Sequence, residues 1–309
     1  MKRHARNVEC LGGSFRNIPR LHLSRETRKR NMHGIVGFSD TQRQRLLELG
    51  EGPETLEIGF DSESERNAYF NSLSKTLCQK NMNILEKLQT GLRRSVLTRI
   101  STQLSDLMIG AGFVEVATPA FLACGLLKKM NISEDDSLWK QIFWIDKGRC
   151  LRPMLAPNLY FLLGHLQRLW PRPIRLFEIG SCWRKESRGA RHLEEFTMLN
   201  LVELGCTGDP QNRLHEVADL VMGTLGLPYD LVKEASQVYG TTMDVVCDGV
   251  EVASGATGPH PLDHNWNITE PWAGLGVGLE RVCMLTTGNG NVQRVGRSLI
   301  YLDGARLNI

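Results

Sequence analysis

The fold is decided by RLFEIGSCWR (residues 175–184) and FTMLNLVEL (residues 196–204), two apolar segments joined by a charged connection of eleven residues. We interpret the two segments as strands that lie on either side of this connection. Asp248-Gly249, flanked by residues 243–247 (MDVVC) and 250–252 (VEV), is the strongest short hairpin signal in the chain. Strands joined in this way, with helices outside them, predict an antiparallel sheet and an α+β fold.

Helices and further strands are expected around this pair. Apolar residues recur every four positions over residues 92–108, and a strand that ends in proline follows over residues 113–119. A second helix is expected over residues 157–170, which begin with proline. Near the C-terminus, GLGVGLER (residues 274–281) runs from an apolar strand into a helix.

The composition is that of an ordinary globular chain. Of the 309 residues, 41% are hydrophobic and 23% are charged, which excludes disordered, collagen-like and coiled-coil classes. No window approaches the roughly 18 apolar residues of a membrane span, and no secretory signal follows the basic start, so a cytoplasmic protein without a membrane partner is expected. The eight cysteines form no Cys-x-x-Cys pair and are expected to be reduced. His260 and His264 are expected in a loop, not at a metal site, because Pro261 between them argues against a helix.

The net charge of +3 is unevenly distributed. Residues 1–31 carry nine Lys/Arg and two Glu, a net charge of +7, and the rest of the chain carries −4. Residues 1–33 show no sustained period and are expected to be a disordered extension. A translation start at Met32 and an Arg-rich transit peptide are the alternatives.

Residues 34–91 are expected to form a small helical module. Ser39 or Asp40 caps a short amphipathic helix that runs up to Gly50. A longer helix begins at Ser62, where the sequence SESE predicts a capping box, and continues past Leu77.

The connection WRKESRGARHLEEF (residues 183–196) is too charged for a plain hairpin turn. Its basic residues, interleaved with Glu186, Glu194 and Glu195, are Arg184, Lys185, Arg188, Arg191 and His192. Guanidinium groups match phosphate oxygens bidentately, and acids can bind an adenine amino group or a metal. The segment therefore indicates polyphosphate binding, and a solvated hairpin with local ion pairs is the competing interpretation.

The glycines of residues 274–281 point to close approach of a ligand. Glycine lets the backbone come near a ligand, and the N-terminus of the following helix attracts anions. Arg281 lies in the first helical turn, where the helix dipole disfavours a cation, so anion binding explains it better than local stability does. Tight packing is the alternative for the glycines, and the strand order argues against a Rossmann unit.

Three elements in chain order match the signature motifs of class II aminoacyl-tRNA synthetases: the strand ending at Pro119, the strand pair around Arg184, and the glycine strand before Arg281. Four segments narrow the resemblance to the catalytic domain of pyrrolysyl-tRNA synthetase, in its bacterial form, over residues 92–309. They are LRPMLAPNLY (residues 151–160), FEIGSCWRKES (177–187), HLEEFTMLN (192–200) and GLGVGLER (274–281).

This resemblance implies an α+β fold with an antiparallel sheet of six to seven strands, flanked by helices and preceded by the helical module. It implies an AMP-forming ligase that uses ATP and Mg²⁺, and a homodimer that forms around residues 113–119. It also implies that the module at residues 34–91 contacts tRNA, and that a small tRNA-binding domain can be a separate polypeptide.

For ATP, the resemblance implies that Arg184 holds the α-phosphate and Arg281 the γ-phosphate, as the two catalytic residues. Glu186 would bond the adenine amino group, and Phe196 would stack on the ring. Glu251 with Ser254 would hold Mg²⁺, although strict strand alternation requires a bulge near Gly255 for this pairing. The remaining ATP contacts implied are His192, Leu193 and Gly276.

The amino-acid pocket combines strand and helix positions. Alternation places Phe196, Met198, Asn200 and Val202 on one strand face. The residues expected around the amino acid are Ala156, Leu159, Tyr160, Leu163, Asn200 and Val202, to which the resemblance adds Tyr239, Ala256, Trp272 and Gly274. None is a carboxylate, so the ammonium of free lysine would be unpaired, whereas an acylated lysine offers apolar bulk and a carbonyl for Asn200. An ordinary core is the alternative for Leu159 and Leu163.

The expected function is therefore activation of pyrrolysine with ATP and its transfer to the cognate amber-reading tRNA. Val277 stands where the family motif usually has an aromatic residue, and Val202 and Ala256 vary at pocket positions, so the side-chain preference can be shifted. The alternatives are a class II synthetase for another bulky or aromatic amino acid, and a catalytically retired paralogue that binds RNA or a partner. The basic N-terminal residues either assist tRNA binding electrostatically or have no function.

Overall fold

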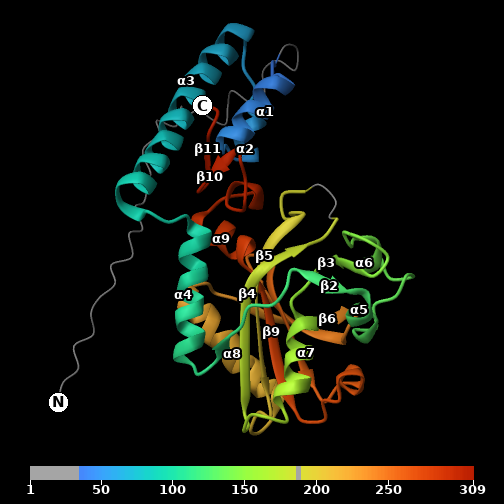
Figure 1. Cartoon of the computed structure of the whole chain (residues 1–309). Coiled ribbons are helices and arrows are strands. Elements are labelled where there is room, and N and C mark those ends of the chain that lie inside the picture. Colours follow the sequence, from blue (N-terminus) through green and yellow to red (C-terminus); the bar gives the residue numbers. More distant parts are fainter. Residues whose placement is uncertain (1–34, 186–188) are drawn as a thin grey trace, which may run out of the picture.

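The computed structural model describes residues 35–185 and 189–309 (Figure 1). The expected basic extension, residues 1–33, lies outside these residues, as does Glu186. The described chain begins with the helices α1 (Asp40–Leu49), α2 (Pro53–Leu56) and α3 (Glu63–Lys87). The predicted caps are confirmed: the Ser39 side chain accepts from the Gln42 backbone N–H, and Gly50 ends α1 in the left-handed conformation.

The module of three helices has a core of its own, and the end of the chain joins it. Ser62 caps α3 by accepting from the Glu65 N–H, while the Glu65 carboxylate accepts from Asp61 N–H. The strand β11 (Ala305–Arg306) lies beside α1 and α3 and pairs with β10 (Tyr301–Leu302) (Figure 1). The buried Asn81 of α3 donates to Leu49 O and accepts from Arg306 N–H, so it ties both helices to the C-terminal segment.

The helix that was predicted to begin at Leu92 begins later in the structure. Leu92 ends a short π-helix, η2 (Leu88–Leu92), that continues α3, and α4 (Val96–Gly110) begins after it. The reason is local, because Arg93 takes a left-handed conformation and the Ser95 hydroxyl caps α4 by accepting from Thr98 N–H. The prediction that Leu92 opens the apolar stripe was therefore wrong. The stripe begins at Val96 and continues through Leu104 and Met108, which are fully buried.

A seven-stranded sheet forms the centre of the molecule, in the order β1-β4-β5-β9-β8-β7-β6. All neighbours are antiparallel except β1 and β4. The strands are β1 (Val114–Glu115), β4 (Ile174–Trp183), β5 (Glu195–Leu204), β6 (Asp230–Ser236), β7 (Gly240–Cys247), β8 (Val250–Gly258) and β9 (Trp272–Gly278). The predicted α+β class, strand number and Asp248-Gly249 hairpin are confirmed, with both turn residues at positive φ.

The strand predicted over residues 113–119 is much shorter, and it is parallel to its neighbour. β1 ends after two residues because Thr118 hydrogen-bonds to the buried ion pair of Glu178 and Arg152 and does not pair with a neighbouring strand. The Thr118 N–H and hydroxyl both donate to the Glu178 carboxylate, which also pairs with Arg152 at 2.7 Å. The Arg152 guanidinium in turn donates to Thr118 O, so the segment before Pro119 is held against β4.

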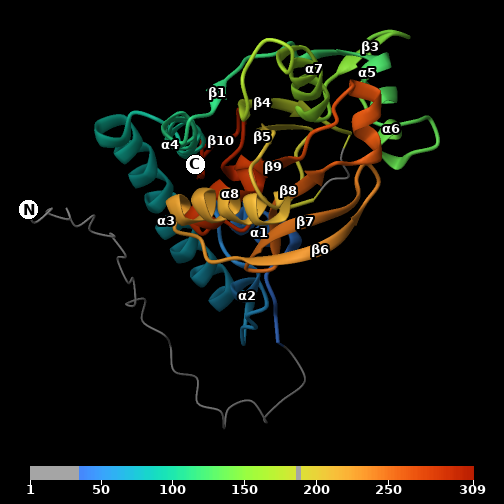
Figure 2. The ribbon, with the colours of Figure 1, turned by 90° about the horizontal axis from the view of Figure 1, so that it is seen from below.

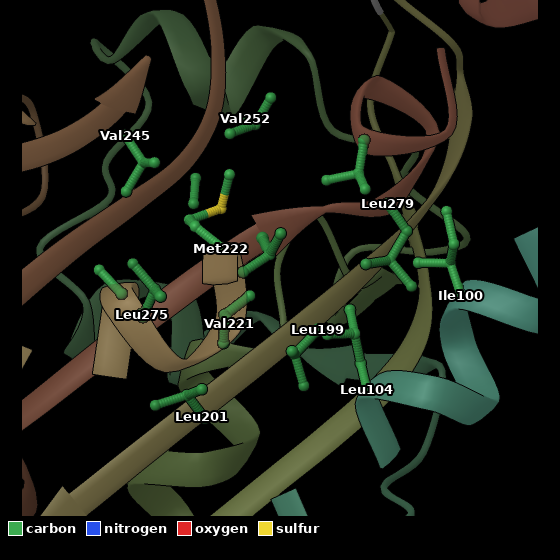
Figure 3. Packing of buried hydrophobic residues seen from close by; sticks show 14 of the residues in the cluster. Ile100, Leu104, Leu199, Leu201, Val221, Met222, Val245, Val252, Leu275 and Leu279 are labelled. Carbon is green, nitrogen blue, oxygen red and sulfur yellow. The ribbon is translucent and has the colours of Figure 1, made fainter. Parts of the chain in front are cut away.

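The two faces of the sheet are covered by different helices (Figure 2). One face packs on α4, α8 (Pro210–Leu225) and α9 (Leu279–Thr287), and Figure 3 shows side chains of β5, β9 and α8 meeting in this core. The other face packs on α7 (Ala156–Leu166), α5 (Cys124–Lys129), α6 (Ser137–Lys140) and the small sheet of β2 (Phe121–Ala123) and β3 (Arg149–Leu151). Along β9, the side chains of Ala273, Leu275 and Val277 lie in the core with α4, α8 and α9. The glycines between them therefore face the side of the sheet that packs on α7.

Two further predictions need correction. The helix expected over residues 157–170 is α7, which ends at Leu166, because Arg172 donates to the free carbonyls of Gln167 and Trp170. The loop expected around His260 is instead a 3₁₀-helix, η3 (Pro261–Trp266), which tolerates Pro261 at its first position. A short segment, η4 (Val292–Arg294), completes the helices of the described chain.

The cysteines, the helix lengths and the acidic and histidine side chains can be stated for the described residues. The seven cysteines there are free thiols, no helix is long and apolar enough to cross a membrane, and no cluster of three or more His, Cys, Asp or Glu could hold a metal.

Candidate active site

A cavity of about 520 Å³ opens on the face of the sheet that packs on α7. It is lined by every described residue that was predicted for the site: Ala156, Leu159, Tyr160, Leu163, Arg184, His192, Leu193, Phe196, Asn200, Val202, Tyr239, Glu251, Ser254, Ala256, Trp272, Gly274, Gly276 and Arg281. Glu186 lies outside the described chain, as does Arg188 of the charged connection that was predicted to bind polyphosphate. Residues more than a hundred positions apart are thus brought to one site.

The floor of the cavity is built by β9 between two strands that carry side chains. Gly276 pairs with Asn200 of β5 on one side and with Ser254 of β8 on the other. A Cβ at Gly276 would lie 3.2 Å from the Asn200 amide nitrogen, so glycine is what leaves room above this strand. Gly274 repeats the arrangement between Val202 and Ala256. The glycine strand therefore creates space for a ligand between two rows of side chains.

At one end of the cavity, an arginine and an aromatic ring come together. The Arg184 guanidinium lies over the Phe196 ring, 5.3 Å from its centroid, and its Nε donates to Pro153 O. These contacts hold the side chain in the cavity, where the charge is close to the ring face. The predicted α-phosphate contact and the predicted adenine contact are therefore neighbours.

Arg281 and Glu251 form a second charged pair at this end. Arg281 extends from the first turn of α9 and donates to Glu251 O at 2.8 Å, and the same nitrogen lies 3.4 Å from the Glu251 carboxylate. Arg281 keeps about a quarter of its side chain exposed. The start of α9 follows Gly278 without a side-chain cap, so its free N–H groups face the same end of the cavity. This end is suited to an anion.

The bulge needed to bring Glu251 and Ser254 together is present, although not at Gly255. The register between β7 and β8 shifts at Val245 and Val246, which pair with Ala253 and Glu251, so Val252 is the extra residue. The Ser254 hydroxyl donates to Asp244 at 2.6 Å. Glu251, Ser254 and Asp244 supply hard oxygen ligands of the kind that Mg²⁺ prefers. With so few protein ligands, phosphate oxygens would have to complete the coordination, which fits a metal that arrives with ATP.

The other end of the cavity is closed by apolar and aromatic side chains. Ala156, Tyr160 and Leu163 form the predicted stripe of α7, and the Tyr160 and Trp272 rings meet edge to face at 5.7 Å. Tyr239 approaches Trp272 at 6.0 Å. Among the described residues, none hydrogen-bonds the Asn200 amide, so it can serve a ligand.

Three polar residues at or beneath the cavity had not been predicted. Glu280, which lines the cavity, accepts from Thr197 N–H and hydroxyl, and burial raises its pKa. Asp244 orients Ser254, and the buried Asp263 accepts from Tyr160 and Trp272. Glu280 stands beside Arg281 in the motif and could have been considered from the sequence. The two aspartates could not, because their partners are set by the fold.

Val277, the departure from the family motif, does not face the cavity. It is fully buried in the core between the sheet and α4, α8 and α9. Val202 and Ala256, the other two departures, do line the cavity.

Among the solved structures to which this chain is similar are two with high identity and coverage. The crystal structure of pyrrolysyl-tRNA synthetase from Desulfitobacterium hafniense is 48% identical with a TM-score of 0.84, and the match covers 88% of this chain and 99% of that one. A second pyrrolysyl-tRNA synthetase structure from the same organism is 47% identical with a TM-score of 0.82, covering 88% and 98%.

More distant relatives are also tRNA ligases. The lysine–tRNA ligase of Xylella fastidiosa is 26% identical over 244 residues, or 77% of this chain. The histidine–tRNA ligase of Methanocaldococcus jannaschii is 29% identical over 140 residues, or 43% of this chain. The chain spans about a third of the length of these curated relatives (34% and 32%). No family model matches the sequence.

Proposed function

The chain belongs to the pyrrolysyl-tRNA synthetase family, and we propose that it activates pyrrolysine with ATP and transfers it to a cognate tRNA. In the first step the amino-acid carboxylate attacks the α-phosphorus of ATP, and the bond to pyrophosphate breaks. In the second step a ribose hydroxyl at the 3′ end of the tRNA attacks the aminoacyl carbonyl and AMP leaves. Neither step needs a nucleophile from the protein, so positioning and charge neutralisation supply the catalysis.

The charged end of the cavity is suited to the nucleotide. Phe196 offers a face for the adenine ring, Arg184 a guanidinium for the α-phosphate, and Arg281 with the start of α9 a site for the γ-phosphate. Glu251 and Ser254 would hold Mg²⁺ on the phosphates, where the metal would neutralise charge that develops on the leaving pyrophosphate. His192, Leu193 and Gly276 complete the nucleotide side, and we assign Glu186 to the adenine amino group by resemblance.

The aromatic end of the cavity indicates which amino-acid side chain the site accepts. The only acids that line the cavity within the described residues, Glu251 and Glu280, lie at the nucleotide end. A free lysine ammonium would therefore lack a counter-charge among the aromatic residues, at a cost of several kcal/mol. An acylated lysine fits instead, with its ring against Tyr160 and Trp272 and its amide carbonyl near Asn200. This absence of an acid, together with the free Asn200 amide, is the observation that carries the assignment.

The partners follow from the reaction and from the surface. The reaction needs a cognate tRNA, which we assign to the side of the helical module at residues 34–91. We propose a homodimer through the exposed edge of the sheet at β1, and a separate tRNA-binding polypeptide as a further partner.

ATP–pyrophosphate exchange tests the proposal directly. We expect exchange that depends on pyrrolysine or a bulky N-acyl-lysine, and none with lysine. Exchange that is equally fast with phenylalanine and absent with acyl-lysines would overturn the substrate assignment. No exchange with any amino acid would favour a retired synthetase. Arg184→Ala is the matched negative control, because it removes one charge and is expected to lower exchange by about 10²–10³.

A further inference from the structure

Beneath the aromatic end of the cavity lies a carboxylate that does not itself line it. Asp263, on η3, is 2% exposed. Its Oδ2 accepts from the backbone N–H of His260 at 2.7 Å, and the His260 ring accepts from Leu262 N–H in return. The carboxylate is thus fixed by the start of its own helix, independently of the cavity.

The two carboxylate oxygens serve two residues of the amino-acid pocket. Oδ2 accepts from Trp272 Nε1 at 2.8 Å, and Oδ1 accepts from the Tyr160 hydroxyl at 3.2 Å. Burial, followed by the nearby Tyr239 and Asp263, raises the pKa of Tyr160 far above its usual range, so the phenol keeps its proton and donates. One carboxylate therefore orients two rings that meet edge to face.

The surroundings leave these rings little freedom. A Cβ at Gly258 would lie 1.9 Å from Trp272 Nε1, so the indole occupies a slot between Gly258 and Asp263. Tyr160 is held on its other side by stacking on Trp266, with ring centroids 5.4 Å apart. Without Asp263 the buried indole N–H would lose its acceptor and the Tyr160 hydroxyl would keep only Tyr239 as a partner, so the rings would repack.

We infer that Asp263 is a positioning residue that sets the side-chain range of the amino-acid pocket by holding Tyr160 and Trp272. The inference deepens the proposed function and rests on it. It concerns the acyl end of an N-acyl-lysine: a bulky five-membered ring fills the corner between the two rings, whereas a small acetyl group does not reach it. Binding of the bulky substrate therefore depends on Asp263 and binding of the small one does not.

Asp263→Asn tests this with little change of shape. The carboxamide oxygen can still accept from Trp272 and from His260 N–H, so the amide N–H₂ faces Tyr160, which must then give up its role as donor. We expect the KM for pyrrolysine to rise about tenfold, with the KM for Nε-acetyl-lysine and for ATP unchanged. The kcat/KM for pyrrolysine divided by the kcat/KM for Nε-acetyl-lysine therefore falls. A general loss of stability would lower both values and leave this ratio unchanged.

A double-mutant cycle tests the contact itself. Tyr160→Phe removes the hydroxyl and keeps Asp263, so it should shift the same ratio, and Asp263→Asn should add little to it. If Asp263→Asn does not fold, Tyr160→Phe alone decides, and an unchanged ratio overturns the inference. Asn265→Ala is the matched control, because Asn265 lies on the same 3₁₀-helix but donates to Lys129 O and to Asn131, outside the cavity.

The remaining outcomes separate the inference from the function it rests on. A wild-type protein that exchanges with pyrrolysine, beside an Asp263→Asn protein with the same preference, overturns the inference alone. Additive effects in the cycle, or equal losses for both amino acids and ATP, also overturn it. A wild-type protein without exchange on any acyl-lysine overturns the proposed function and the inference with it.

Discussion

Arg281 donates a 2.8 Å hydrogen bond to the backbone carbonyl of Glu251, and the same guanidinium nitrogen lies 3.4 Å from the Glu251 carboxylate. The Arg281 guanidinium, proposed to bind the γ-phosphate, and the Glu251 carboxylate, proposed to bind Mg²⁺, thus neutralise one another in this structure. Phosphates and metal would take the place of this contact, each presenting the opposite charge to one of the two side chains. Both residues should therefore act on ATP and leave the amino-acid pocket unchanged.

Arg281→Ala is expected to lower kcat/KM for ATP in pyrophosphate exchange by about 10²–10³, because one guanidinium donor to the developing charge is lost. Folding should survive, since the side chain is partly exposed. Arg149→Ala is the control, because Arg149, at the start of β3, is exposed and pairs with Asp146 outside the cavity. Equal exchange rates for wild type and Arg281→Ala would remove Arg281 from the mechanism.

Glu251→Gln is expected to raise the Mg²⁺ concentration for half-maximal exchange by at least about tenfold, because a charged oxygen ligand is lost. EDTA should abolish exchange in wild type, and excess Mg²⁺ should restore the variant. The measurement is the exchange rate against free Mg²⁺ at saturating ATP. Glu234→Gln, an exposed carboxylate on β6, is the matched control. A Mg²⁺ dependence shared by wild type and Glu251→Gln would argue against metal binding here.

Gly276→Ala tests the floor of the cavity. The new methyl group would lie 3.2 Å from both the Asn200 amide nitrogen and the Met198 methyl carbon, so the amide must move. We expect the KM for pyrrolysine to rise about tenfold with a folded protein. Gly223→Ala in α8 is the control, because no heavy atom lies within 4 Å of its Cβ position, and alanine there should raise the unfolding free energy by up to about 1 kcal/mol. Unchanged kinetics in Gly276→Ala would place the amino acid elsewhere.

Much of this site could be predicted from the sequence, because strand alternation and helical spacing determine which neighbouring residues share a face. Alternation along β5 placed Asn200 and Val202 on one face, and helical spacing placed Ala156 and Tyr160 together. Tyr239 and Trp272 came only from the resemblance. The resemblance also implied the sheet, but not that β1 would leave it after two residues.

What the sequence could not show depends on contacts between distant residues. The Glu178 carboxylate ends β1 by binding Thr118, sixty residues before it. Asp263 meets Tyr160 across 103 residues. A bulge at Val252, rather than near Gly255, follows from how β7 and β8 pair and not from any local residue preference.

Glu280 gives a pH dependence of stability. Burial raises the pKa of its carboxyl above the ordinary 4.5, against the opposing hydrogen bonds from Thr197. Between 4.5 and the raised value the unfolded chain has lost the proton and the folded chain still holds it, so this group lowers stability as pH rises. The amide side chain in Glu280→Gln cannot ionise, so this variant does not lose stability at residue 280 as pH rises.

The stability advantage of wild type over Glu280→Gln should therefore be larger at pH 4.5 than at pH 7.5. Between these pH values, the difference in unfolding free energy between wild type and Glu280→Gln changes by about 1.4 kcal/mol for each unit by which the pKa of Glu280 is raised in the folded protein. Urea unfolding of both proteins at the two pH values measures it, and Glu234→Gln reports the effect of an exposed glutamate. An advantage that grows with pH would show that the folded protein prefers the ionised carboxylate.

The proposed dimer makes a prediction about the edge of the sheet. β1 is an edge strand, and the apolar side chains of Ile109, Val114 and Phe121, all within one short segment, are 44–59% exposed. Edge strands and exposed apolar groups of this kind mark association surfaces. Sedimentation of wild type should give the mass of two chains, and Ile109→Asp with Val114→Asp should give one chain, because two charges would be buried without partners. Leu299→Asp is the control, since Leu299 is 97% exposed beside the C-terminal strands, far along the chain from β1. If the Leu299 variant dissociates while the double variant remains a dimer, the interface lies at the C-terminal end and the assignment to β1 is wrong.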